Sequence, residues 1–167
     1  MTTVTATAPP PPPPPQGGET YRLALPNTPV AAKIARDFVS SLLGTSSHRT
    51  RPELVDDARL CTTEVVTNAH RHTRTPLIRV HVTVGHRDVT VSVTDDRPWA
   101  LPMPAPTATE DTEDGEDAED AEGGRGISLV ASLAVAWGAT IYGGEDSCRK
   151  AIWFTLRNVD TATRTPG

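Results

Sequence analysis

The sequence predicts an α+β fold, a two-layer α/β sandwich in which helices pack on one face of a mixed β-sheet. Three observations lead to this prediction. Two segments with helical periodicity precede residue 73, an alternating stretch that doubles back as a hairpin follows them, and a further helix precedes two short strands. Helices and hairpins grouped in this way are typical of helices segregated on one face of a sheet.

The length of 167 residues suggests one domain, with tails at both ends. We expect the domain over residues 19–158, after a disordered Pro-rich tail at 1–18 and before a C-terminal tail at 159–167. The run Pro9–Pro15 favours an extended polyproline helix without internal hydrogen bonds. A solvated tail is the preferred interpretation, and docking to an aromatic groove on a partner is the alternative.

A second low-complexity segment, Ala105–Glu122, carries nine carboxylates and no basic residue. Because it cannot bury enough apolar surface to offset its ordering entropy, we expect a mobile acidic loop over residues 98–122. Without Ala105–Glu122 the chain has 16 basic and 12 acidic residues, so the overall net charge of −5 becomes +4. This mildly basic body has no basic helix or DNA-binding motif, and we expect no nucleic-acid partner.

The two cysteines, Cys61 and Cys148, form neither a disulfide framework nor a metal-ligand spacing. No apolar run approaches the ~20 residues that would span a bilayer, and the N-terminus has no signal pattern. We therefore expect a cytoplasmic protein with reduced thiols and no membrane association.

The first elements are a weakly alternating strand at Glu19–Pro26 and a helix over residues 28–44. Thr28 suits the N-cap, Pro29 the first helical position and Gly44 the C-terminal stop. The stripe of this helix expected to face the core consists of Val30, Ile34, Phe38 and Leu42, with Val39 and Leu43 alongside.

A second helix is predicted from about Pro52 to His72. Its apolar stripe consists of Ala58, Cys61, Val65 and Ala69. Glu64 and Asn68 lie one turn apart at the edge of this stripe. A carboxylate beside apolar surface is a candidate general base, and a carboxamide oxygen can hold a metal ion. Judged by spacing alone, an ordinary solvent-facing helix edge is the commoner interpretation.

Two alternating strands, Ile78–Val84 and Val89–Asp95, predict a β-hairpin with its turn at Gly85–Asp88. Asp95 ends the second strand, where a carboxylate can accept a hydrogen bond from an exocyclic amine. Asp96 beside it leaves the assignment between the two carboxylates open, and a polar strand end is the ordinary alternative.

The "GGRG" stretch, Gly123–Gly126, is expected to open a third helix that stops at Gly138. Strands around Ala139–Tyr142 and Ala151–Arg157 should follow. Glycines at a helix N-terminus let backbone N–H groups approach an anion closely, and the helix dipole favours its charge. A simple turn is the ordinary alternative.

In this order, "TEVVTNAHRHT", "VTVSVTDDRP", "GGRGISLVASLAVAWG" and "KAIWFTL" resemble the Bergerat-fold (GHKL, histidine-kinase-like) ATPases, from about Tyr21 to Arg157. Within that family the sequence is most similar to the small bacterial anti-sigma-factor serine/threonine kinases. The resemblance implies that Glu64 activates the attacking nucleophile and that Asn68 binds the Mg²⁺ ion bridging the phosphates of ATP. It also implies that Asp95 binds the adenine amine.

By the same resemblance, Gly124 and Gly126 line the phosphates, and Arg125 helps to hold them. Residues 98–122 then form a lid over the nucleotide. The implied function is phosphorylation of an anti-sigma-factor antagonist, which controls sigma-factor availability in transcription. The implied partners are the antagonist, the sigma factor or both, and the resemblance also allows a homodimer.

Three features depart from the family pattern. The second box usually reads Asp-x-Gly-x-Gly, whereas Asp95–Pro98 contains neither glycine. A threonine that commonly supports the adenine-binding aspartate from the last strand falls at Ala151. The acidic lid adds negative charge where phosphates should bind. These departures leave two alternatives open, namely a non-catalytic nucleotide sensor that sequesters a partner and a domain that binds protein only.

Overall fold

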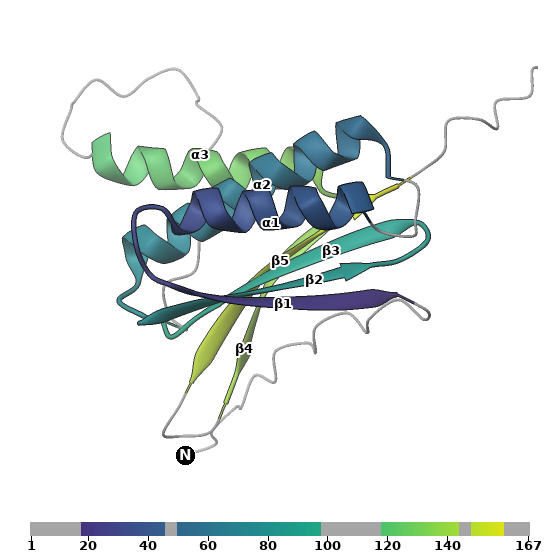
Figure 1. Ribbon diagram of the computed structural model, residues 1–167. Helices are drawn as coiled ribbons and strands as arrows, with labels where there is room; N and C mark the ends of the chain where they lie inside the picture. Colours follow the sequence, from purple (N-terminus) through teal and green to yellow (C-terminus); the bar gives the residue numbers. More distant parts are fainter. Residues whose placement is uncertain (1–17, 46–49, 98–117, 144–147, 159–167) are drawn as a thin grey trace, which may run out of the picture.

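Three helices cover one face of a five-stranded sheet in the computed structural model of the protein (Figure 1). The structure describes residues 18–45, 50–97, 118–143 and 148–158, and for residues 118–125 it describes only the backbone. The elements are β1 (Glu19–Pro26), α1 (Ala31–Thr45), α2 (Pro52–His72), β2 (Leu77–Val84), β3 (Asp88–Asp95), α3 (Ala118–Leu133), β4 (Ala136–Tyr142) and β5 (Arg149–Arg157). The predicted α+β two-layer class is confirmed.

The sheet has the order β1-β2-β3-β5-β4, and all four neighbouring pairs are antiparallel. The expectation of a mixed sheet was therefore wrong. Two helices, not one, separate β1 from β2, so the chain returns beside β1 in the opposite direction. At the other edge of the sheet, β5 lies between β3 and β4 and is antiparallel to both. The strands β3 and β4 therefore run in the same direction without being neighbours.

The core lies between the helix layer and the valine-rich faces of the central strands. Alternate residues of β2, β3 and β5 point into it, and Phe154 is the largest fully buried side chain among the described residues. Cys61 of α2 belongs to this core. Burial raises the pKa of its thiol to about 12, so the group packs as a small apolar side chain.

Helix α1 presents a different face to the core from the one predicted. Ala31, Ala35, Val39 and Leu43 are buried, whereas Val30 is 54% exposed and Ile34 45% exposed. The predicted stripe was wrong by one position at its N-terminal end. Helix α1 packs along α2, and its buried positions in the first turns are the small residues Ala31 and Ala35.

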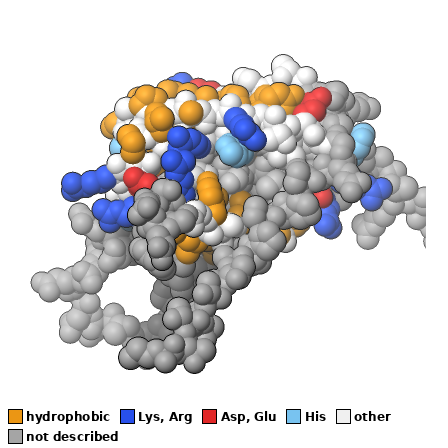
Figure 2. Space-filling view, turned by 90° about the horizontal axis from the view of Figure 1, so that it is seen from below, with side chains coloured by type: hydrophobic (Ala, Val, Ile, Leu, Met, Phe, Trp, Pro, Cys, Tyr) orange, Lys and Arg blue, Asp and Glu red, His pale blue; other side chains and the backbone are white. Residues whose placement is uncertain are grey.

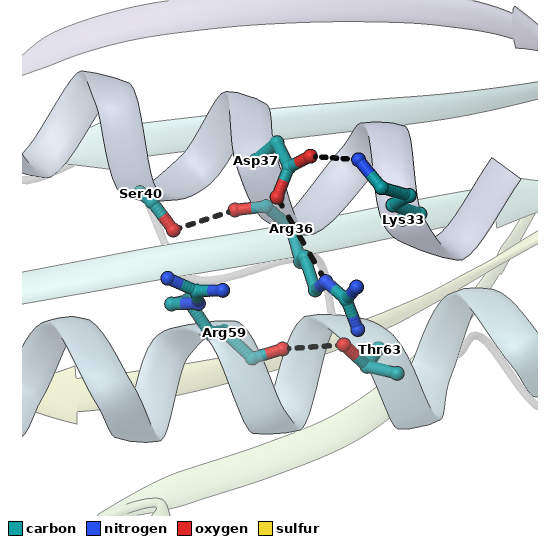
Figure 3. Close-up of polar contacts among 6 residues, drawn as sticks. All are labelled: Lys33, Arg36, Asp37, Ser40, Arg59 and Thr63. Carbon is teal, nitrogen blue, oxygen red and sulfur yellow. Dashed lines mark hydrogen bonds and ion pairs between the residues drawn. The ribbon is translucent and has the colours of Figure 1, made fainter. Parts of the chain in front are cut away.

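Part of the surface of α1 and α2 is polar, and hydrogen bonds link its groups along each helix (Figure 3). Lys33 Nζ donates to Asp37 Oδ2 at 2.8 Å, and the Ser40 hydroxyl donates to the Arg36 carbonyl at 2.8 Å. The hydrogen bond from Lys33, aided by the charges of Arg36 and Arg59, lowers the pKa of Asp37. This exposed surface provides control positions that lie outside the candidate site.

The face of the sheet opposite the helices carries a cross-strand row of Arg22, His81, Ser92, Trp153 and Gly138. Burial, together with the charges of Arg22 and Arg79, lowers the pKa of His81. Figure 2, which views the molecule from this side, shows Lys, Arg and His side chains close together on the described surface.

Helix α3 differs from the prediction at both ends. It begins at Ala118, so Gly123–Gly126 lie inside the helix and do not open it. The segment "AEDAE" before the glycines combines good helix formers with acidic residues, which favour a helix N-terminus. Residues 98–117 of the expected lid lie outside the described residues, and Ala118–Glu122 are helical, which contradicts a loop through residue 122.

Gly138 lies within β4 and does not stop a helix. Helix α3 ends at Leu133, and Ala136 already pairs with Thr155 of β5. A Cβ atom at Gly138 would come within 2.9 Å of the ring of Trp153. The glycine is thus explained by the tryptophan that packs across it.

Candidate functional site

Helix α2 begins at Pro52 and ends at His72, as predicted. Pro52 at the first position and Glu53 in the first turn suit a helix start, and the basic residues of the last turn complement the helix dipole. The C-terminal end is anchored by a 2.6 Å hydrogen bond between His70 Nδ1 and Asn27 Oδ1. These features hold the second half of α2, which carries Glu64 and Asn68, in place on the sheet.

Glu64 is half-buried and faces α3. A Cβ atom added at Gly126 would overlap the Glu64 carboxylate and come within 3.4 Å of the Glu64 Cβ atom. Gly126 itself is buried. The structure therefore brings together two of the predicted site residues, one from each helix, in a contact that requires the glycine.

Asn68, one turn beyond Glu64, carries a buried amide nitrogen with no hydrogen-bond partner among the residues that the structure describes. Buried polar groups in native proteins are nearly always paired, and an unpaired one costs about 1–3 kcal/mol. An unpaired amide beside Glu64 indicates a place for a ligand. We call Glu64, Asn68 and Gly126 the α2–α3 end of the candidate site.

Gly124 and Arg125 lie in the part of α3 for which only the backbone is described. Because the helix begins at Ala118, their N–H groups belong to the body of the helix and not to its first turn. The expectation that these residues open the helix was therefore wrong, and their role in binding stays a prediction. The contact of Gly126 with Glu64 is what the structure shows for the glycine-rich stretch.

Asp95 ends β3 and is 3% exposed. Its Oδ1 atom accepts the Arg97 backbone N–H at 2.8 Å, and its Oδ2 atom lies 3.4 Å from Lys150 Nζ. Burial raises the pKa of this carboxyl, whereas the Arg97 N–H and the Lys150 ammonium act in the opposite direction. Asp96 is exposed, so the buried carboxylate of the two is Asp95.

The sequence analysis did not identify Lys150. In the β3–β5 ladder Asp95 pairs with Lys150, whereas Ala151 pairs with Thr94. Successive residues of a strand point to opposite faces, so the residue of the last strand that contacts Asp95 is Lys150, and Ala151 points to the other face. The alternation Lys150, Ile152, Phe154 and Leu156 contained the signal, because it places a lysine on the core face of β5. We call Asp95, Lys150 and the Arg97 N–H the β3–β5 end.

Both ends border the same helix–sheet interface, because α2 packs against α3 and also against β3 and β5. A cavity of about 130 Å³ reaches Asp95 at the end of the hairpin, but Arg79 and Thr94, which also line it, lie on the face of the sheet opposite the helices. It is smaller than the ~300–1,000 Å³ typical of ligand sites. By itself, this cavity is therefore too small to enclose a large ligand.

No group of three or more His, Cys, Asp or Glu side chains among the described residues is arranged to hold a metal ion. Within the same residues, no helix has the length and apolar character needed to cross a membrane.

Comparison with known proteins agrees with this architecture. Residues 25–146 match the family described as the histidine kinase-like ATPase domain. A structure described as "The crystal structure of the RsbU and RsbW domains of Rv1364c from Mycobacterium tuberculosis" is similar over 89% of this chain and 35% of that chain, with 17% sequence identity and a TM-score of 0.59. That likeness shows the fold. No curated protein matches the chain. Because the family match covers well over half of the sequence, the chain belongs to the histidine kinase-like ATPase domain family.

Proposed function

We propose that the protein is an ATP-binding regulatory kinase that transfers a phosphoryl group to a serine or threonine of an anti-sigma-factor antagonist. Phosphorylation would then control the availability of a sigma factor. Support comes from the family match, from the motifs that resemble anti-sigma-factor kinases, and from the fold shared with a structure that contains RsbU and RsbW domains. The observation that carries the nucleotide-binding part is the unpaired buried amide of Asn68 beside Glu64.

The residues of the α2–α3 end fit a Mg²⁺–nucleotide complex. The unpaired atom of Asn68 is its amide nitrogen, a donor that suits a phosphate oxygen. Its amide oxygen would be the ligand for Mg²⁺, which prefers oxygen ligands and usually keeps water and substrate phosphates in its shell. When bound, the ion would neutralise charge on the phosphates. Glu64, half-buried and held against Gly126, is placed to accept the proton of an incoming hydroxyl group.

At the β3–β5 end, Asp95 would accept a hydrogen bond from the exocyclic amine of adenine. Gly124 and Arg125 complete the proposed binding residues along α3. The second candidate function is a nucleotide sensor that sequesters its partner without phosphorylating it. The segment Asp95–Pro98 lacks both glycines of the family's second box, and this departure favours an alternative without catalysis.

Isothermal titration of the full chain tests the binding proposal. We expect Asn68→Ala to weaken binding of ATP in the presence of Mg²⁺ much more than binding of ADP in the presence of a chelator, because the metal contact that the variant loses forms only when Mg²⁺ is present. Asp37→Asn, on the polar outer surface of α1, is the matched control and should bind both nucleotides as the wild type does. Equal affinities of wild type and Asn68→Ala for both nucleotides would contradict the proposal.

A further inference from the structure

Asp95 and Lys150 form a buried pair on the helix side of the sheet. They are directly opposite each other in the β3–β5 ladder, each is 3% exposed, and Oδ2 lies 3.4 Å from Nζ. The other residues on this face of β5, Ile152, Phe154 and Leu156, are apolar. Replacing a buried ion pair by apolar residues is often neutral or stabilising, so a pair at this position calls for an explanation other than stability.

The pair changes what the β3–β5 end can recognise. A carboxylate alone accepts hydrogen bonds and repels an oxygen atom, so it selects a ligand that presents an N–H group. Lys150 adds an ammonium group, which only donates. Because Oδ2 and Nζ are 3.4 Å apart, a ligand atom that hydrogen-bonds to one of them lies near the other as well.

We infer that Lys150 is a specificity-determining residue that makes the nucleotide site accept purines with either an amino or an oxo group at position 6. This inference rests on the proposed nucleotide-binding function. A 6-amino group donates to Asp95, and the neighbouring ring nitrogen N1 accepts from Lys150. A 6-oxo group accepts from Lys150, and the protonated N1 of such a base donates to Asp95.

The charge balance supports this assignment. The Arg97 N–H occupies Oδ1, and the Lys150 ammonium compensates the charge of the carboxylate at Oδ2, so Asp95 does not present an uncompensated carboxylate to a carbonyl oxygen. A lone Asp95 would discriminate strongly against a 6-oxo purine, because an oxygen lone pair would face a desolvated carboxylate. Lys150 removes that discrimination while leaving the acceptor for the 6-amino group in place.

The test compares the dissociation constants of ATP and inosine triphosphate, which differ only at positions 1 and 6 of the base. Titrations at about pH 8, in Mg²⁺, keep carboxyl groups ionised. We expect the wild type to bind the two nucleotides within about tenfold of each other. In Lys150→Met, which keeps the length of the side chain and loses the donor, the preference for ATP should rise by about tenfold to a hundredfold, as expected for a lost hydrogen bond to a charged group.

Lys150→Arg keeps a charged donor and should retain the wild-type ratio. Because a ratio of two affinities is unaffected by a general loss of folded protein, partial instability of Lys150→Met does not imitate the expected result. If the wild type already rejects inosine triphosphate more than a hundredfold, or if the ratio is the same in wild type and Lys150→Met, Lys150 is only a structural counter-ion. Wild type that binds neither nucleotide overturns the proposed function itself, whereas tight ATP binding with strong rejection of the 6-oxo base overturns this inference alone.

Discussion

The two ends of the candidate site differ in how their polar groups are satisfied. At the α2–α3 end, the Asn68 amide nitrogen is buried without a partner in the described part of the chain. At the β3–β5 end, both oxygens of Asp95 have donors, Arg97 N–H and Lys150. The first end has a buried donor that the protein leaves unpaired, whereas the polar groups of the second end are satisfied within the protein. Substitutions should therefore affect mainly ligand binding at the first end, and protein stability as well as ligand binding at the second.

The largest effect is expected from Gly126→Ala on phosphoryl transfer. The added methyl group would displace the Glu64 carboxylate, which is the flexible end of a side chain, so the fold should accommodate it. Alanine also favours a helix by about 1 kcal/mol over glycine. We expect the transfer rate to a verified antagonist to fall by about 10²–10⁴-fold, the range for loss of a general base, while ATP binding and thermal stability are retained.

Glu64→Gln is the companion variant, and it should lose a similar factor in rate. Single-turnover assays with labelled ATP measure both. A wild-type rate in Gly126→Ala combined with a low rate in Glu64→Gln would show that the helix contact does not position the carboxylate. No turnover by the wild type with an antagonist that it binds would favour the sequestering alternative.

The second effect is on stability and separates the two ends directly. Lys150→Met leaves Asp95 buried without its cationic partner and should cost about 3 kcal/mol in the free energy of unfolding, at the lower end of the range for broken buried pairs because the ion pair is long at 3.4 Å. Asn68→Ala removes an amide nitrogen that has no described partner, so without nucleotide it should change stability little. Urea unfolding of both variants gives the comparison, and equal losses would contradict it.

The helices and strands that the sequence predicted well are those with strong local signals. Helix α2 combines a proline start with a regular apolar stripe, and its bounds were correct. The hairpin strands β2 and β3 alternate regularly, and they too were found. Asp95 was placed at its strand end by the same pattern. Local periodicity was sufficient in these cases because burial on one face determines it.

The errors have non-local causes. Val30 and Ile34 are exposed, whereas the smaller Ala31 and Ala35 are buried. Which of these positions faces the core depends on how α1 packs on the rest of the fold, and the apolar pattern within α1 alone does not reveal it. Gly138 was read as a helix stop because its partner, Trp153, is distant in the sequence. Lys150 was overlooked because its significance depends on the pairing of β5 with β3, a strand more than fifty residues earlier.

The smallest expected effect is a pH dependence at the β3–β5 end. Burial raises the pKa of Asp95 in the folded protein above its ordinary value of 3.8, and the Lys150 ammonium opposes that rise. In Lys150→Met the opposing charge is gone, so the folded-state pKa should rise further while the unfolded-state pKa does not change. Between these two pKa values the folded state binds a proton that the unfolded state has already lost.

Stability therefore decreases as pH increases through that window and levels off above the folded-state pKa. The stability deficit of Lys150→Met relative to wild type should be largest at about pH 8 and smaller at about pH 5, by roughly 1.4 kcal/mol for each unit by which the substitution raises the pKa. Urea unfolding of both proteins at a series of pH values measures the deficit. The double variant Asp95→Asn/Lys150→Met has no carboxyl group at this position, and its deficit relative to the single variant Asp95→Asn should not vary with pH. A deficit of the single variant that is constant from acid to alkaline pH would mean that Lys150 does not control the charge of Asp95, and the difference between the two ends would then reflect packing instead of electrostatics.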